Sequence, residues 1–224
     1  MGLNSRVFKL MTDYAKSGGK ALAAGYPDML VTQQDLLDAG ISPEVIIPAD
    51  EDSEKIVREH GVNIPCAYDA KSVFTALNYD LDVVDINVSR SGERYTDLNY
   101  PHHIGSYDLV LDHGTIEHCF NIAQAAINLA EAVKEGGIIV QHLPMTMLNH
   151  GFYNINPTWF HALYSADNGF ELLHLEVMAG DKHSQGVVPA HNHFVVNTTS
   201  SLLTCVARRI EQKKILYPTQ EKYK

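Results

Sequence analysis

The strongest constraint on the fold lies between residues 107 and 143, where two apolar runs enclose a helix-length segment. The runs YDLVLD (Tyr107–Asp112) and GGIIVQHL (Gly136–Leu143) have the continuous apolar character of strands that are buried on both faces. The segment between them has apolar residues at helical spacing, and Lys134 with the two following glycines predicts the end of that helix. The apolar positions are Ile122, Ala125, Ala126, Leu129 and Val133. Such a strand–helix–strand unit is parallel and right-handed by default.

Strands and helices alternate upstream of this unit as well. The run LDVVDI (Leu81–Ile86) predicts a second central strand, and a short strand is expected to end at Asp97. Helices are expected over residues 33–40, 50–61 and 71–78, and a less pronounced strand around Met29–Thr32. Downstream, FELLHLEVM and SSLLTCVARRI predict an antiparallel pair. The expected fold class is therefore α/β, a mostly parallel sheet with helices on both faces and an antiparallel C-terminal strand pair.

The chain is expected to form one domain over residues 1–224. No internal repeat, low-complexity tract or linker rich in proline, glycine and serine divides it. Its charged end, residues 212–224, is expected to fray. Three widely spaced cysteines, an odd number, favour reduced thiols over a disulfide framework.

Charge and hydropathy exclude two classes of partner. The formal net charge is −10, and no run of basic residues is present to follow a phosphate backbone, so we expect no nucleic acid partner. No apolar run approaches the roughly 18 residues that cross a bilayer, so we expect no membrane association and a cytoplasmic protein. The expected partner is a small molecule, and a homodimer is left open.

Three acids stand where apolar strands end. They are Asp85, Asp97 and Asp112. In an open parallel sheet, ligands bind outside the carboxyl ends of the strands. A carboxylate at the end of the second strand can accept hydrogen bonds from both ribose hydroxyls of a nucleoside cofactor. The alternative is that each aspartate caps the helix that follows it.

Several segments resemble bacterial class I methyltransferase-like proteins that use S-adenosylmethionine, in a branch often found beside polysaccharide genes. The resemblance extends from about Lys20 to Glu176 and is most specific in GTIEHCFN and HGFYNINP. Upstream, ALAAGYPDMLVT and VVDINVSRSGERYTDLNYP are also similar to this family. The resemblance implies a Rossmann-like fold, S-adenosyl-L-methionine as the cofactor, and a transferase acting on a small hydroxyl-bearing acceptor such as a sugar.

Carried over by position, the resemblance implies a first cofactor turn at Gly25, ribose binding at Asp85 and an adenine site near Asp97. The full set of implied cofactor-binding residues is Gly25, Asp85, Ile86, Asp97, Leu98, Asp112, His113 and Gly114. Methyltransferases at large have a GxGxG first loop, whereas AAGYPD has one glycine. Close backbone approach to a cofactor favours glycine. A chain that kept the fold as a non-catalytic binding protein is therefore the alternative.

The catalytic candidates are Glu117, His118 and His150. His118 follows the Asp112 strand on the expected first helical turn, where it could take a proton from a substrate hydroxyl while Glu117 orients it. The loop PMTMLNHGFYNINP is expected to cover the same crevice with polar groups. Its substrate-binding candidates are Asn149, Tyr153 and Asn156.

A metal site is not expected from the histidine spacing. His113 and His118 are five residues apart, which does not place two imidazoles on one helical face. The HNH segment places His191 and His193 on one face of a strand, but no carboxylate follows nearby. A His-dependent metalloenzyme is the least favoured alternative. No Walker loop, GxSxG elbow or G-x-G-x-x-G motif is present either.

Overall fold

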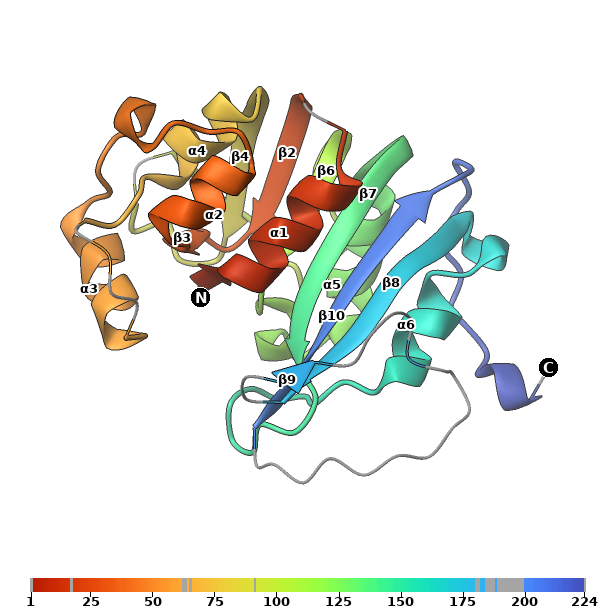
Figure 1. Cartoon of the computed structure of the whole chain (residues 1–224). Coiled ribbons are helices and arrows are strands. Elements are labelled where there is room, and N and C mark those ends of the chain that lie inside the picture. The colour runs from red at the N-terminus through yellow and green to blue at the C-terminus, as the bar shows by residue number, and fades with distance from the viewer. Residues whose placement is uncertain are drawn as a thin grey trace.

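The protein is built around one eight-stranded sheet in the order β5-β4-β2-β6-β7-β10-β8-β9 (Figure 1). The computed structural model describes residues 2–16, 18–61, 64, 66–90, 92–179, 182–183, 188 and 200–223. The HNH histidines lie outside these residues. The strands of the sheet are β2 (Gly19–Ala24), β4 (Tyr79–Asp85), β5 (Glu93–Tyr95), β6 (Tyr107–Asp112), β7 (Val133–Pro144), β8 (Phe170–Ala179), β9 (Lys182–His183) and β10 (Ser201–Arg209).

The sheet has a parallel half and an antiparallel half. Strands β5, β4, β2, β6 and β7 are parallel neighbours, whereas β10 pairs antiparallel with both β7 and β8. The predicted α/β class with an antiparallel C-terminal pair is thus confirmed, and the fold is Rossmann-like. A separate two-stranded parallel sheet joins β1 (Gly2–Asn4) to β3 (Asp28–Leu30).

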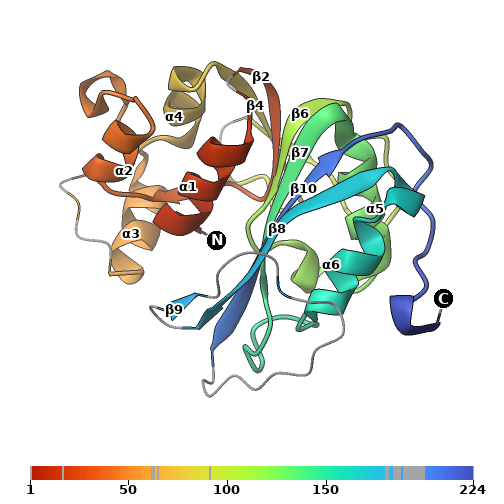
Figure 2. The same ribbon diagram turned by 45° about the vertical axis from the view of Figure 1, so that its right-hand side comes forward.

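Helices cover both faces of the large sheet (Figure 2). The helices are α1 (Ser5–Tyr14), α2 (Gln33–Asp38), α3 (Glu51–Glu59), α4 (Ala70–Ala76), α5 (Ile122–Ala132) and α6 (Pro157–Leu163). Alternate strand residues face opposite sides. Leu22 of β2 and Val110 of β6 pack in the core beneath α5 and α6, whereas Ala23 and Leu111 pack in the core beneath α1 and α4. Each face therefore has its own hydrophobic core.

The structure corrects three details of the predicted elements. Strand β2 was not expected, and the predicted strand near Met29 is β3, which pairs outside the large sheet. Helix α5 ends at Ala132, so Lys134 and the glycines do not cap it. Gly136 has φ +81° within β7 instead, opposite a register shift in β6, and a Cβ at Gly137 would lie 2.9 Å from the Asp108 carbonyl oxygen. The glycines thus permit a bulge.

The end of the chain packs back onto the domain in part. Ile215 is buried in the core beneath α5 and α6, and the Leu216 N–H donates to Asn168 Oδ1 at 2.9 Å. The segment that was expected to fray therefore contains anchored residues. The three cysteines are free thiols, as predicted.

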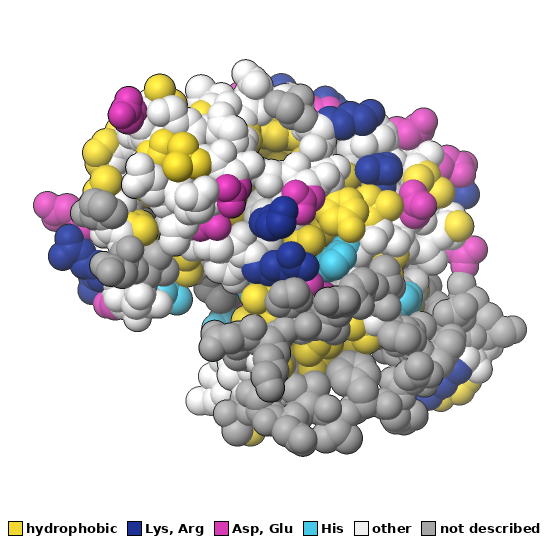
Figure 3. All heavy atoms as spheres, viewed as in Figure 1, with side chains coloured by type: hydrophobic (Ala, Val, Ile, Leu, Met, Phe, Trp, Pro, Cys, Tyr) yellow, Lys and Arg dark blue, Asp and Glu magenta, His cyan; other side chains and the backbone are white. Residues whose placement is uncertain are grey.

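On the face that carries α1, acidic and basic side chains are interspersed (Figure 3), so the net charge of −10 is not concentrated on that face.

Within the described part of the chain, every helix is too short or too polar to cross a membrane.

Candidate functional site

A cavity of about 400 Å³ opens at the carboxyl ends of β2, β4, β5 and β6. From β2 the chain continues to β4 and β5 on one side and then crosses back to β6 on the other side of β2, so the strand order reverses at β2. Crevices at such a point are where open α/β sheets bind ligands, and the volume is that of a small-molecule site. Its lining includes Gly25, Tyr26, Asp85, Ile86, Asn87, Arg90, Thr96, Asp97, Leu98, Asn99, Gly114, Thr115, His118 and Cys119.

The turn after β2 brings backbone close to the cavity. Gly25 has φ +78°, a conformation that favours glycine, and its N–H donates to the Val84 carbonyl at 2.8 Å. A Cβ at Gly25 would lie 2.9 Å from Thr115 Oγ1 and 3.8 Å from Asp85 Oδ2. The Thr115 hydroxyl in turn donates to the Ala24 carbonyl at 2.6 Å. The single glycine of AAGYPD thus stands where a side chain would crowd Thr115 and the cavity.

Two of the three strand-end acids line this cavity. Asp85 Oδ1 accepts the Asn87 N–H at 2.8 Å, which fixes the carboxylate at the end of β4. Asp97 Oδ1 accepts from the backbone N–H and the side-chain amide of Asn99, at 3.0 and 2.7 Å. Leu98 lies between them in sequence and adds a buried apolar surface to the wall. The site therefore has a polar floor at Asp85 and a mixed wall at residues 97–99.

Asp112 and His113, two of the implied cofactor residues, do not line the cavity. Asp112 is fully buried, and its carboxylate accepts hydrogen bonds from the Thr115 N–H at 2.9 Å and from Gln141 Nε2 at 2.7 Å. Burial raises its pKa, against the lowering effect of these hydrogen bonds. His113 is also buried, with Nε2 at 3.3 Å from the Tyr26 carbonyl. Gly114, with φ +108°, and Thr115 are the residues of this turn that reach the cavity.

One wall was not anticipated from the sequence. The Arg90 guanidinium lies 4.4 Å from the Tyr26 ring centroid, donates to Ser53 Oγ at 2.8 Å and pairs with Asp28 at 2.5 Å. The Tyr26 hydroxyl donates to Asp69 Oδ2 at 3.1 Å. Arg90 and Tyr26 both lie in loops that follow strand ends, after β4 and β2. Their position after strands is the sequence feature from which their place in the site could have been predicted.

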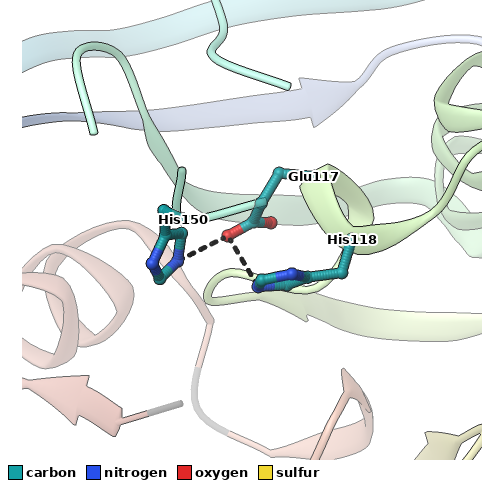
Figure 4. A group of neighbouring side chains, drawn as sticks. All are labelled: Glu117, His118 and His150. Atoms are coloured by element: carbon teal, nitrogen blue, oxygen red, sulfur yellow. Dashed lines mark ion pairs between the residues drawn. The ribbon is translucent and has the colours of Figure 1, made fainter. Parts of the chain in front are cut away.

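Three side chains predicted as catalytic lie close together (Figure 4), and one of them, His118, lines the cavity. Glu117 and His118 belong to a 3-10 turn, Ile116–His118, which precedes α5, and His150 comes from the loop after β7. The two histidine Nε2 atoms lie 3.7 Å (His118) and 3.5 Å (His150) from Glu117 Oε1. The imidazole rings are 5.1 Å apart between centroids. The carboxylate thus points between two imidazoles, of which the His118 ring also lines the cavity.

Glu117, His118 and His150 form a rim cluster, and burial shifts the pKa values of Glu117 and His118. Glu117 is fully buried, and burial together with the nearby Asp112 raises its pKa to about 8. The pKa of His118 is lowered by burial and by the neighbouring His150. The pKa of the adjacent Cys119 thiol is raised to about 12 by burial and by Asp112, so this thiol is not a nucleophile at neutral pH.

The predicted substrate residues are not brought together at the cavity. Tyr153 and Asn156 line a separate hollow with Trp159 of α6, and the Tyr153 hydroxyl donates to the Phe120 carbonyl at 2.8 Å. Asn149 is exposed beside His150 and has φ +61°, in the left-handed region. The loop after β7 therefore contributes His150 to the rim but does not cover the cavity with the expected polar side chains.

Comparisons with known proteins find similarity only among solved structures. No family model and no curated protein matches the chain. TehB from Haemophilus influenzae is similar at 13% identity and TM-score 0.45, over 92% of this chain, which spans 62% of that chain. The N-methyltransferase NodS from Bradyrhizobium japonicum WM9 is similar at 13% identity and TM-score 0.44, over 92% of this chain and 94% of that one. These likenesses are distant and concern the fold.

Proposed function

We propose that this protein binds S-adenosylmethionine in the cavity at the carboxyl ends of β2, β4, β5 and β6, and transfers its methyl group to a small hydroxyl-bearing acceptor such as a sugar. The observation that carries the proposal is the position of Asp85, at the end of the strand beside the reversal point and facing the close approach at Gly25. The sequence resemblance described above supports the choice of cofactor.

The residues of the cavity fit the parts of such a molecule. Asp85 would accept hydrogen bonds from the ribose hydroxyls, and residues 97–99 would flank the adenine. Gly25 and Gly114, which present backbone without side chains, would lie along the methionine part. When bound, the cofactor supplies an electrophilic methyl group on a sulfonium, which becomes a neutral thioether when the methyl group leaves.

The rim cluster is the part of the site that would face the acceptor. His118 lines the cavity, and His150 is its neighbour, so an acceptor hydroxyl held there lies beside two imidazoles. Loss of the hydroxyl proton to an imidazole leaves an oxygen lone pair to form the new bond to the methyl carbon. Most of the rate would come from holding the oxygen in line with the methyl group. Tyr153 and Asn156 are not part of this proposal because they line another hollow.

Replacing Asp85 by alanine is expected to weaken the binding of S-adenosylmethionine and S-adenosylhomocysteine by about 100-fold. The substitution removes two charge-assisted hydrogen bonds to the ribose, whose combined contribution is about 3 kcal/mol. Calorimetric titration of each ligand into wild-type and Asp85→Ala protein measures the difference.

Asp80→Ala is the matched control for this experiment. Asp80 is an exposed aspartate on the same strand, five positions before Asp85 and outside the cavity. It should leave the affinity unchanged. Absence of binding to the wild-type protein would overturn the proposal and favour the non-catalytic alternative. Equal binding by wild type and Asp85→Ala would remove Asp85 from the site.

A further inference from the structure

The rim cluster joins two segments that are far apart in the sequence, and the loop after β7 is held against the Glu117 turn. The Phe152 N–H donates to the Glu117 carbonyl at 2.9 Å, and the Phe152 ring packs edge-to-face on Phe120 at 5.6 Å. A Cβ at Gly151 would lie 2.9 Å from the Glu117 carbonyl oxygen, so the two backbones meet where only glycine fits. These contacts place His150 beside the Glu117 carboxylate.

The backbone next to His150 is itself constrained. Asn149 has φ +61°, a region that residues other than glycine rarely occupy. Such conformations persist where the surrounding structure imposes them, and they concentrate at ligand-binding sites. The turn at Asn149 thus sets the course of the backbone that carries His150, a half-buried residue, to the Glu117 turn.

The Glu117 carboxylate lacks the partners that a buried acid normally has. The side chain is fully buried, and apart from its own backbone N–H the carboxylate has no hydrogen-bond donor among the described residues. Among the described basic side chains, His118 and His150 contact it, with Nε2 atoms 3.7 and 3.5 Å from Oε1, beyond good hydrogen-bond distance. A buried carboxylate is normally paired with a cation or coordinates a metal. The ligand atoms of Glu117, His118 and His150 lie within 4.8 Å of one another, close enough for one cation to contact all three.

We propose that Glu117, His118 and His150 bind one divalent transition-metal ion. One ligand atom from each side chain lies within 4.8 Å of the others, and no other described group of histidine, cysteine, aspartate and glutamate side chains is arranged in this way. Metal–ligand distances of about 2.0–2.2 Å place neighbouring donor atoms about 3 to 3.5 Å apart. The Glu117–histidine distances of 3.5 and 3.7 Å therefore need only small side-chain rotations.

The donor set indicates which ions the site takes. Two imidazole nitrogens and one carboxylate oxygen suit Zn²⁺, Fe²⁺, Co²⁺ or Mn²⁺, whereas Mg²⁺ and Ca²⁺ prefer oxygen ligands alone. Three protein ligands leave coordination positions open, as in catalytic sites. His118 lines the cavity, so an open position can face it.

The role of the ion in activating an acceptor deepens the proposed function and rests on it. The binding of the ion is independent of the proposed function. An acceptor hydroxyl that coordinates a divalent ion has a lowered pKa and loses its proton to solvent more readily. In this arrangement the two histidines hold the ion through Nε2, so solvent takes the acceptor proton in place of an imidazole. The same three residues would thus activate the acceptor oxygen opposite the cofactor.

Metal titration of the chelator-treated full chain tests the proposal. Calorimetry with Zn²⁺ is expected to show about one ion per chain, and Co²⁺ is expected to give the visible absorption of a bound ion. Glu117→Gln and His150→Ala should each weaken Zn²⁺ binding by at least about 100-fold, because the loss of an outer partner alone costs 10- to 100-fold. Mg²⁺ should not compete at equal concentration.

The controls address the other histidines and the stability of the variants. His103→Ala removes an exposed histidine outside the cluster, and a double His191→Ala/His193→Ala variant removes the HNH pair. Both should bind Zn²⁺ as the wild type does. Zn²⁺ should raise the melting temperature of the wild type but not that of Glu117→Gln, and melting of the metal-free variants reports their folding.

The results separate this proposal from the proposed function. Sub-stoichiometric Zn²⁺ binding, or binding that Glu117→Gln and His150→Ala retain, would overturn the metal site while leaving cofactor binding to stand. Stoichiometric Zn²⁺ binding without S-adenosylmethionine binding would support the metal site and count against methyl transfer. Each titration is carried out without the other ligand, so neither result depends on the other.

Discussion

Replacing Asp112 by alanine is expected to lower the free energy of unfolding by about 4 kcal/mol, and the melting temperature by about 12 °C. Asp112 is fully buried, and its carboxylate accepts the Thr115 N–H and the Gln141 side-chain amide, at 2.9 and 2.7 Å. Gln141 Oε1 accepts the Tyr164 hydroxyl at 2.5 Å. Alanine would leave these buried donors without an acceptor, and such losses are costly. Urea denaturation followed by circular dichroism measures the difference.

Tyr164→Phe is the matched control for the Asp112 network. It removes only the hydroxyl at the far end of the same chain of hydrogen bonds and is expected to cost about 1 kcal/mol. Asp112→Ala should also weaken cofactor binding, because Asp112 holds the turn that carries Gly114 and Thr115 into the cavity. Equal stabilities of Asp112→Ala and Tyr164→Phe would show that the carboxylate does not organise this turn.

The second large effect is expected from Glu176, whose carboxylate should contribute about 3 kcal/mol of stability at neutral pH. Burial raises its pKa, but hydrogen bonds from His174 and Arg6 outweigh burial and lower the pKa from 4.5 to about 2. Arg6 donates to both carboxylate oxygens, at 2.9 and 2.7 Å, and His174 Nε2 lies 3.1 Å away. This contribution follows from a shift of roughly 2.5 pKa units at 1.36 kcal/mol each.

The sign of the pH dependence follows from the lowered pKa. The stabilisation is fully present above pH 4.5, the ordinary value, and is lost as the pH falls from there toward 2. Glu176→Gln should therefore be less stable than the wild type by about 3 kcal/mol at pH 7, and the two proteins should converge near pH 2. Unfolding by urea at a series of pH values measures this. Glu171→Gln alters an exposed glutamate of the same strand and should follow the wild type at every pH. A constant difference between wild type and Glu176→Gln would contradict the assignment.

The parallel half of the sheet could be predicted because its strands have the composition that buried strands require. Strand β6 ends at Asp112, the last residue of its apolar run, and β4 ends one residue before the end of its own run. Strand β2 was missed because its sequence, GKALAA, contains three alanines, and alanine favours helices. Only the flanking strands β4 and β6, which pair with it on both sides, determine that this segment is extended.

Some residues of the candidate site could likewise be predicted from the sequence, whereas others could not. Asp85 and Asp97 line a cavity at the edge that the strand-end argument predicted, because the carboxyl ends of parallel strands meet at one edge of a sheet. Gly25 and Gly114, which the family resemblance implied, line it as well. The burial of Asp112 could not be predicted, because a strand-end acid that binds a ligand and one that caps its own turn have the same sequence.

By itself, the sequence determined the fold class and the edge of the sheet where the acids Asp85 and Asp97 gather, because these follow from local periodicity and strand ends. Only the tertiary structure decided which histidines meet. His113 and His118 were judged as a pair from their spacing, whereas His118 meets His150, 32 residues later in the chain, across Glu117. That meeting depends on contacts between Phe152, Gly151 and the Glu117 backbone. Contacts between segments that are far apart in the chain leave no periodic pattern in the sequence. The proposed metal site could therefore be recognised only in the tertiary structure, where the loop after β7 packs on the Glu117 turn.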